Sequence, residues 1–455
     1  MLKNFMWFIA RVLVSIFDSK FGQIFHLRKL IHPIRKSYLV AYELSRRFQN
    51  AFLANVVHAR KRAEFKKVLE QRRGNTLGLF IQSHCIEWNV PLFQRPQHMA
   101  RALSQAGFIV VYLTPNIWHD NVNGYDEIEP NLFLTNDLRL VFNISNAFVS
   151  CYSTSSAYVP REIEEIRAKG NKIIYEYIDH IDPKISWSYV SKLQSVFDYI
   201  SRDTVDYVFV SSRLLAKEMA EKVDDDQMLS VPNGVDFLHY QNSLRGDKRT
   251  IPKELIEFVN SGQPIVGYFG AIAPWLWFEL IEEFVEDCPD FNFLFIGPDY
   301  LGASERLPKR ENFLHLGPID YKQLPLYACC FTIGIIPFAL GKIARTTSPL
   351  KLFEYFALGK PVVVTSEMYE CTVYPEVLHA ADPKEFRACM QRAINYSKDD
   401  KYKDLLVKHA TNNTWQCRAR SVVEILSKFE STDGCPLPVN EIQQSNSTLV
   451  SGNTS

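Results

Sequence analysis

The stretch 346–364 reads Thr346-Thr-Ser-Pro-Leu-Lys-Leu-Phe-Glu-Tyr-Phe-Ala-Leu-Gly-Lys-Pro-Val-Val-Val364. Its apolar residues recur at helical spacing, which predicts a short buried helix. Gly359 is the residue type that most often ends a helix, because it adopts positive φ without strain. The run 361–364, a proline followed by three β-branched valines, then predicts a buried strand. The stretch is therefore interpreted as a helix that leads directly into a core strand.

The start of this helix is suited to an anion. Ser348 is a good N-cap residue, and Pro349 fits the first helical position, where its missing N–H costs nothing. The amides of Leu350 and Lys351 then stay free at the positive end of the helix dipole. The Lys351 ammonium would be unfavourable in the first turn unless an anion is bound there.

Glu354 places a carboxylate inside the same apolar helix. It follows the expected cap by six residues, roughly 9 Å along the axis at the rise of an α-helix. That offset is comparable to the separation of diphosphate and ribose in a nucleotide. The alternative is a capped core helix whose lysine and glutamate reach solvent. The aromatic neighbours favour the binding interpretation, because a buried carboxylate needs a donor.

The 455 residues suffice for two or three domains, and the formal net charge of zero hides an asymmetry. Residues 1–74 hold 16 Lys and Arg against 4 Asp and Glu, a balance of +12. We expect this basic helical extension to meet an anionic membrane surface or another polyanion. Residues 1–17 would form a helix that either lies in a membrane interface or packs on the protein body. They are too short and too charged to span a bilayer.

Other compositional features exclude several classes of function. The nine cysteines are scattered without C-x-x-C spacing, which predicts reduced thiols and a cytoplasmic location, with no secretory signal. The sequence has no metal-ligand spacing, no Walker A motif and no basic-aromatic platform. We therefore expect no metal, no cofactor and no nucleic-acid partner.

From residue 77 onward, apolar runs alternate with helical patterns. The predicted strands are 77–81, 108–113, 147–151, 172–178, 207–210, 264–269, 291–296, 313–316, 331–336 and 361–364. This alternation predicts two Rossmann-like, doubly wound α/β domains, at 75–245 and 246–412, with ligands at the carboxyl ends of the strands. A helix at 413–430 is expected to return to the first domain. The polar tail 431–455 is expected to be disordered.

Taken in order, several segments resemble glycosyltransferase family four, which has the GT-B fold. They are Phe93–Ala100 (F-Q-R-P-Q-H-M-A), Val231–Asp236 (V-P-N-G-V-D), Val266–Ala271 (V-G-Y-F-G-A), Phe295–Pro298 (F-I-G-P) and Ser348–Glu354 (S-P-L-K-L-F-E). The first is similar to members that build teichuronic-acid-like and other cell-surface polysaccharides. The resemblance implies a retaining, metal-independent hexosyltransferase at the inner face of a membrane. It would move a sugar from a nucleotide-sugar donor to a glycan or lipid-linked acceptor.

The resemblance also assigns a donor site to the second domain. It implies that Glu354 binds the ribose hydroxyls, and that Lys351 and the amides after Ser348 meet the diphosphate. Gly270 would let the backbone approach the donor without a side chain in the way. Gly317 would border the base.

Two departures from the family pattern concern the reacting groups. The family has paired carboxylates eight positions apart, but Thr346 stands eight positions before Glu354. The carboxylate that usually faces the transferred sugar is therefore absent. The family's G-R-x4-K-G cation pair is missing as well. Arg345 and Lys342 are the candidate cations for the leaving diphosphate, beside Lys351. Exposed loop charges are the alternative for both.

The first domain supplies the catalytic and acceptor candidates. Asp179 and His180 stand at the end of a predicted strand, where they would orient sugar hydroxyls or merely cap a turn. Arg95 and His98, at a helix start, are candidates for acceptor binding, with Arg95 on a phosphate. A salt bridge is the alternative for Arg95. His84 has only its position after the first strand in its favour.

Two other functions remain open. Because the first carboxylate is missing, one alternative is a non-catalytic GT-B module that binds nucleotide or glycan. A sugar-nucleotide epimerase of the same fold would need no acceptor.

Overall fold

The computed structural model describes residues 58–83, 86–186, 189–202, 205–244 and 252–430. By its internal contacts the chain divides at Glu64, and the residues from Phe65 onward form one compact unit. The predictions for residues 1–57, including the helix at 1–17, lie outside the described residues, as does the predicted tail 431–455.

The first sheet is eight-stranded in the described part of the chain, in the order β3-β4-β2-β1-β5-β6-β7-β8. Its strands are β1 (Leu79–Ser83), β2 (Ile109–Leu113), β3 (Tyr125–Glu129), β4 (Leu132–Thr135), β5 (Phe148–Tyr152), β6 (Lys172–Tyr177), β7 (Tyr207–Val210) and β8 (Met228–Ser230). All neighbours pair in parallel except β3, which is antiparallel to β4 at one edge.

The second sheet is six-stranded and parallel over the described residues, in the order β11-β10-β9-β12-β13-β14. Its strands are β9 (Ile265–Phe269), β10 (Asn292–Ile296), β11 (Phe313–His315), β12 (Ile333–Ile336), β13 (Val362–Thr365) and β14 (Leu378–Ala380). The prediction of an α/β fold with two parallel sheets is confirmed. The domain limits at 245, 412 and 430 stay predictions.

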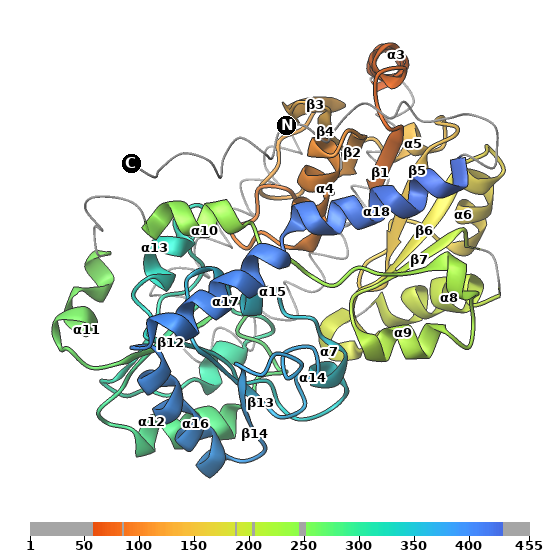
Figure 1. Ribbon diagram of the computed structural model, residues 1–455. Helices are drawn as coiled ribbons and strands as arrows, with labels where there is room; N and C mark the ends of the chain where they lie inside the picture. The colour runs from red at the N-terminus through yellow and green to blue at the C-terminus, as the bar shows by residue number, and fades with distance from the viewer. Residues whose placement is uncertain (1–57, 84–85, 187–188, 203–204, 245–251, 431–455) are drawn as a thin grey trace, which may run out of the picture. The chain divides into compact units, whose positions relative to one another are not determined.

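Helices connect the strands of both sheets (Figure 1). Those around the first sheet are α3 (His58–Arg73), α4 (Arg95–Gln105), α5 (Leu138–Val141), α6 (Pro160–Arg167), α7 (Pro183–Ser186), α8 (Val190–Ile200) and α9 (Arg213–Met219). Those that follow β8 are α10 (Phe237–Leu244), α11 (Ile256–Asn260), α12 (Phe278–Asp287), α13 (Leu324–Ala328), α14 (Lys342–Thr346), α15 (Leu350–Ala357), α16 (Pro383–Tyr396), α17 (Asp400–Asn412) and α18 (Trp415–Glu430).

The last helix packs on the first sheet's layer, as Figure 1 shows for α18 beside α4. Trp415, Val422 and Leu426 of α18 are buried in one cluster with Leu103 of α4. Burial of large apolar side chains stabilises a fold by about 1.5–3 kcal/mol each. The helix therefore ties the C-terminal part of the described chain to the layer built by its first half.

The predicted end of α15 at Gly359 is confirmed in detail. Gly359 has φ +63°, and its N–H donates to the Phe356 carbonyl at 2.9 Å. The Lys360 N–H reaches back to the Tyr355 carbonyl, also at 2.9 Å. This pair of bonds is the Schellman arrangement, which satisfies carbonyls left open at the helix end. Gly359 thereby sets the direction in which the chain enters β13.

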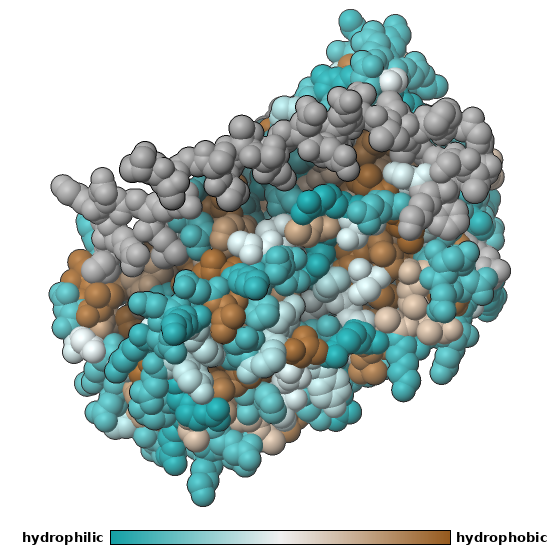
Figure 2. Space-filling model, in the orientation of Figure 1, coloured by the Kyte–Doolittle hydropathy of each residue, from teal (hydrophilic) through white to brown (hydrophobic). Residues whose placement is uncertain are grey.

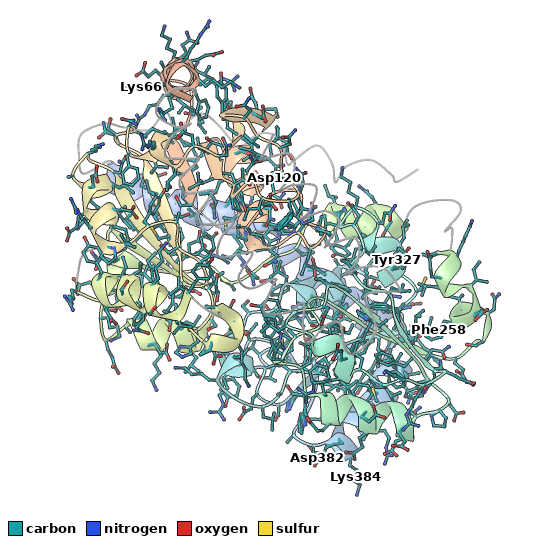
Figure 3. All side chains as sticks on the ribbon, turned by 180° about the vertical axis from the view of Figure 1, so that it is seen from behind. Lys66, Asp120, Phe258, Tyr327, Asp382 and Lys384 are labelled. Atoms are coloured by element: carbon teal, nitrogen blue, oxygen red, sulfur yellow. The ribbon has the colours of Figure 1, made fainter. Side chains whose placement is uncertain are left out.

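Two carboxylates fasten the loops that follow β1 and β2. Glu87 accepts backbone N–H bonds from residues 117–120, among them Trp118 at 2.8 Å. Asp120, labelled in Figure 3, accepts in return from the amides of Trp88 at 2.7 Å and Asn89 at 2.9 Å. Each loop therefore supplies the acceptor for the other, which fixes both at the carboxyl ends of their strands.

Within the described part of the chain, none of the helices combines the length and the apolar character needed to cross a bilayer. On the face drawn in Figure 2, hydrophobic residues are scattered among hydrophilic ones. Single exposed apolar side chains such as Leu238, at 62% exposure, are ordinary on such a surface.

Candidate functional site

The start of α15 differs by one residue from the prediction. Pro349 is the N-cap, with φ −78° and ψ 129°, and no side chain caps the helix. Ser348 does not act as the cap, because its hydroxyl accepts the Asn233 N–H at 3.2 Å instead. The Asn233 side-chain amide also donates to the Ser348 carbonyl. The predicted N-cap role of Ser348 is therefore wrong, although the residue still fixes the approach to the helix.

The first amides of α15 remain available. The Leu352 N–H makes the first bond of the turn, to the Pro349 carbonyl at 3.3 Å. Among the described residues, no acceptor takes the amides of Leu350 and Lys351. These are donors of the kind that bind phosphate oxygens at helix starts.

The Lys351 ammonium lies over two rings, 5.3 Å from the centroid of Tyr268 and 5.3 Å from that of Phe338. No carboxylate of the described chain comes within ion-pair distance of it. Burial lowers its pKa to about 8, while the charges of Glu354 and Asp179 oppose that fall. A partly desolvated cation without a close anion favours an anionic ligand.

Three glycines meet beside this lysine at the ends of β9, β10 and β11. Gly270 has φ +137°, and a Cβ there would lie 2.9 Å from Lys351 Cε. A Cβ on Gly297 would lie 1.8 Å from the Gly270 carbonyl oxygen. The Gly297 N–H donates to the Gly317 carbonyl at 2.8 Å. Backbone thus replaces side chains around the ammonium, while open space surrounds Gly317, where φ is +72°.

Glu354 is buried, with 6% of its surface exposed. Burial raises the pKa of its carboxyl to about 7, whereas the Tyr240 hydroxyl and the Lys351 charge oppose that rise. The expectation that the Glu354 carboxylate is buried is confirmed. The expected donor is not, because the buried Tyr240 hydroxyl makes no hydrogen bond among the described residues. The alternative, in which the side chain reaches solvent, is excluded by the burial.

Asp179 lies on the Lys351 side of the same site. It follows β6 and is partly buried, and the Thr347 hydroxyl donates to its Oδ1 at 3.4 Å. Burial raises the pKa of this carboxyl to about 7, and Thr347, Arg95 and Lys351 oppose that rise. The structure therefore brings the carboxylate that follows β6 to Thr347, four residues before Lys351.

His180 points to a different set of groups. Its Nδ1 lies 3.4 Å from the Tyr177 hydroxyl and 3.9 Å from the Glu218 carboxylate. Burial lowers the pKa of the imidazole, and Lys342 adds to that fall. Glu218 in turn pairs with Lys342 at 3.1 Å. His180 and Lys342 therefore belong to one network, and Lys342 is not a free cation.

The other candidate cation is paired too. The Arg345 guanidinium forms an ion pair with Glu367. Thr346 is buried, and its hydroxyl donates to the Lys342 carbonyl at 2.8 Å within α14. It therefore does not replace the missing carboxylate. Donor binding by Arg345 stays a prediction that would require the pair with Glu367 to open.

Arg95 is buried, not exposed to an acceptor. Its Nε lies 3.0 Å from Glu176, and the two side chains are 2% and 1% exposed. Its Nη1 donates to the Val231 carbonyl at 2.8 Å and to Asn233 at 3.2 Å. The salt bridge, and not the phosphate contact, is the arrangement found. Arg95 orders the segment that reaches Ser348 through Asn233.

His98 is likewise a core residue, at 3% exposure. Its ring stacks on Trp415 at 5.1 Å and 8°, with Phe93 edge-on at 4.8 Å. Burial holds its pKa well below the usual range. These contacts join α4 to α18 and leave no access for an acceptor. His84 lies outside the described residues.

Several residues near the site were not predicted from the sequence. Tyr240, Thr347 and Tyr268 contact the site but stand in no recognisable motif. Asn233 is in the V-P-N-G-V-D segment, whose position was predicted but not its bonds to Ser348. Of these residues, Asn233 could have been found from the sequence, because it lies in that segment.

No protein-family model matches the chain. It is 30% identical over 230 residues to TuaH of Bacillus subtilis strain 168, whose name assigns it provisionally to teichuronic acid biosynthesis as a glycosyltransferase. The match covers 48% of this chain and 56% of TuaH. The chain thus spans about half the length of the curated relative that it matches.

Solved structures resemble much more of the chain. An E. coli trehalose-6-phosphate structure with bound UDP-2-fluoro glucose has a TM-score of 0.56 at 11% identity, covering 77% of this chain and 98% of that one. HepE of Anabaena, in complex with UDP and glucose, has a TM-score of 0.51 at 13% identity, covering 77% and 99%. The fold is that of the GT-B glycosyltransferases. In this GT-B fold, Lys351, Glu354 and Asp179 gather near the carboxyl ends of parallel strands, where such sheets bind ligands.

Proposed function

We propose that the chain is a retaining glycosyltransferase of cell-surface polysaccharide synthesis. It would transfer a hexosyl group from a nucleotide-sugar donor to a glycan or lipid-linked acceptor. The observation that carries the proposal is the Lys351 ammonium, which has no close carboxylate within the described chain and stands beside two free amides. The names of TuaH and of the UDP-bound structures support it.

In the proposed complex, the diphosphate binds the amides of Leu350 and Lys351 and the Lys351 ammonium. Glu354 stands four residues beyond Leu350, roughly 6 Å along the helix. Its carboxylate would accept bonds from the ribose hydroxyls. The open space at Gly317 would admit the base. UDP is the first nucleotide to test, because it is present in the HepE structure.

The transfer would need no enzymic nucleophile. The bond between the sugar C1 and the diphosphate oxygen breaks, and the acceptor oxygen forms the new bond on the same face. The acceptor proton passes to the leaving diphosphate. Lys351 and the helix amides stabilise the charge that develops there, a role that preorganised donors fill without a metal ion. Asp179 would hold hydroxyls of the transferred sugar from the opposite side.

Product analysis tests this proposal against its rivals. The full chain is incubated with a panel of sugar nucleotides, with and without glycan acceptors. Nucleoside diphosphate and a retained-configuration glycoside are the expected products, undiminished by EDTA. Tight binding without turnover would instead favour the non-catalytic module that Thr346 suggests. Conversion of the donor sugar without any acceptor would favour an epimerase.

We further propose that residues 1–74 bring the enzyme to an anionic membrane surface. In the described part of this segment, Lys66 points outward from α3 (Figure 3), where Arg60 and Lys67 are exposed as well. Each such charge near an anionic surface contributes about 1 kcal/mol.

Deletion of residues 1–20 should release the protein from phosphatidylserine vesicles in a flotation assay, because it removes the predicted interfacial helix. Neutral phosphatidylcholine vesicles should capture neither form. Unchanged capture of the deleted form by phosphatidylserine would contradict the proposed membrane contact.

Replacement of Glu354 by Gln should stabilise the ligand-free protein above about pH 7. Burial raises the folded pKa from 4.5 to about 7, so the unfolded chain ionises first as the pH rises. The folded state therefore loses stability between these values, by about 3–4 kcal/mol at 1.36 kcal/mol per pKa unit. Gln removes that loss, which urea unfolding at about pH 8 and about pH 5 would measure.

Glu367→Gln is the matched control. The pKa of Glu367 is lowered by its hydrogen bond from Arg345, so its ionised form stabilises the folded state. The control should therefore lose stability at about pH 8 or stay unchanged. A Glu354→Gln variant that is less stable than the parent at about pH 8 would contradict the assigned burial cost.

A further inference from the structure

A pocket of about 480 Å³ lies beside the candidate catalytic strand end. It is framed by the end of β6, by α8, by α9 and by Lys342 of α14. The volume falls in the range of small-molecule sites and suits one or two sugar rings. None of the donor contacts proposed above uses it.

Some charged side chains of this pocket are ion-paired and others are not. Glu218 accepts the Tyr177 hydroxyl bond at 2.5 Å and pairs with Lys342 at 3.1 Å. Lys217 and Lys222 have no carboxylate within ion-pair distance in the described chain. Lys222 lies instead over the Phe197 ring, at 5.8 Å. Two lysines are thus free to meet an anion, against the one unpaired carboxylate of Glu221.

The pocket adjoins the reacting groups through two short pieces of chain. His180, one of its lining residues, directly follows Asp179. Lys342 begins α14, and the Thr347 that follows this helix bonds to Asp179 at 3.4 Å. A sugar held in the pocket would therefore extend toward Asp179. Phe197 and Tyr177 offer ring faces, and Gln194 and Glu221 offer polar groups for hydroxyls.

We propose that this pocket is an acceptor subsite for a sugar that bears an anionic group, a carboxylate or a phosphate, held by Lys217 and Lys222. The assignment rests on the proposed transferase function and adds the chemical class of its acceptor. Two unpaired ammonium groups that line the same pocket would select such a sugar over a neutral one, because charge-assisted hydrogen bonds are about twice as strong as neutral ones.

Calorimetric titration of the full chain with three probes tests the subsite. The probes are methyl glucuronoside, glucose 6-phosphate and methyl glucoside, each added with UDP at saturation so that the start of α15 is occupied. We expect at least one anionic probe to bind at least tenfold more tightly than the neutral glucoside. Whichever anionic probe binds more tightly identifies a carboxylate or a phosphate as the group recognised.

The double variant Lys217→Ala/Lys222→Ala should lose at least tenfold in affinity for that anionic probe and nothing for UDP. Lys384→Ala is the control, since Lys384 lies exposed on α16, away from the pocket (Figure 3). Equal binding of the neutral glucoside, or unchanged affinity in the double variant, would overturn the subsite. Failure of the parent chain to bind any nucleotide would overturn the donor site instead, independently of the lysine result.

Discussion

A Lys351→Met variant should bind UDP about a hundredfold more weakly and turn over about 10²–10³-fold more slowly at saturating donor. Methionine keeps the unbranched stem of lysine and lacks only its terminal ammonium, which lies over Tyr268 and Phe338. The loss in kcat arises because negative charge grows on the diphosphate as the sugar leaves. Initial rates and UDP titrations measure the two effects separately.

Arg345→Met is the matched control for that variant. Arg345 is already paired with Glu367, so its removal should cost less than about tenfold in either quantity. Losses as large as those of Lys351→Met would show that the ion pair opens and that Arg345 is the leaving-group cation.

The pH dependence gives the same prediction a second readout. The pKa of Lys351 is lowered by burial to about 8, and the ligand requires the protonated form. Raising the pH from about 7 to about 9 removes most of that charge and should weaken UDP binding about tenfold. The phosphate itself ionises near pH 6 and contributes little in this window. In Lys351→Met the tenfold dependence should be lost, leaving only the smaller change from Glu354 and Asp179, whose pKa values of about 7 lie at the edge of this window.

An Arg95→Met variant should be destabilised by about 3–5 kcal/mol, because it leaves the Glu176 carboxylate buried without its partner. Bonds to the Val231 carbonyl and to Asn233 are lost as well. Urea unfolding at neutral pH measures the effect. Since Asn233 holds Ser348, donor affinity should also fall at temperatures where the variant remains folded.

The exposed pair of Arg387 and Asp287, at 44% and 43% exposure, supplies the control. Arg387→Met should change stability by less than about 1 kcal/mol. Arg95→Met could instead be as stable as Arg387→Met and lose affinity for the acceptor but not for the donor. That result would restore the interpretation of Arg95 as a phosphate-binding residue.

Most of the sheet strands were predictable, because long apolar runs indicate strands buried on both faces. Strands β3, β4, β8 and β14 were missed; β4 (L-F-L-T) is buried but has only four residues. β3 reads Y-D-E-I-E and is largely exposed at the sheet edge, and β8 and β14 have three residues each. Edge position and shortness remove the apolar signal that sequence analysis uses.

The site was predictable where one helix contains it. Lys351 and Glu354 lie one turn apart, so helical spacing alone brings them to one site. The burial of α4 could not be predicted from local spacing in the same way. Trp415, which covers His98, stands more than 300 positions later in the chain, and only the fold shows that Arg95 and His98 are enclosed. The same holds for Tyr240 and Thr347, whose contacts cross between distant segments.

The central claim is that the start of α15, with Glu354, is a nucleotide-sugar donor site. Calorimetric titration of the full chain with UDP-, GDP- and ADP-sugars, repeated with Glu354→Ala, tests it most directly. We predict saturable binding of at least one of these donors and a loss of about tenfold to a hundredfold in the variant, as removal of a hydrogen bond to a buried charge implies. Equal affinities of parent and variant for every donor would contradict the account.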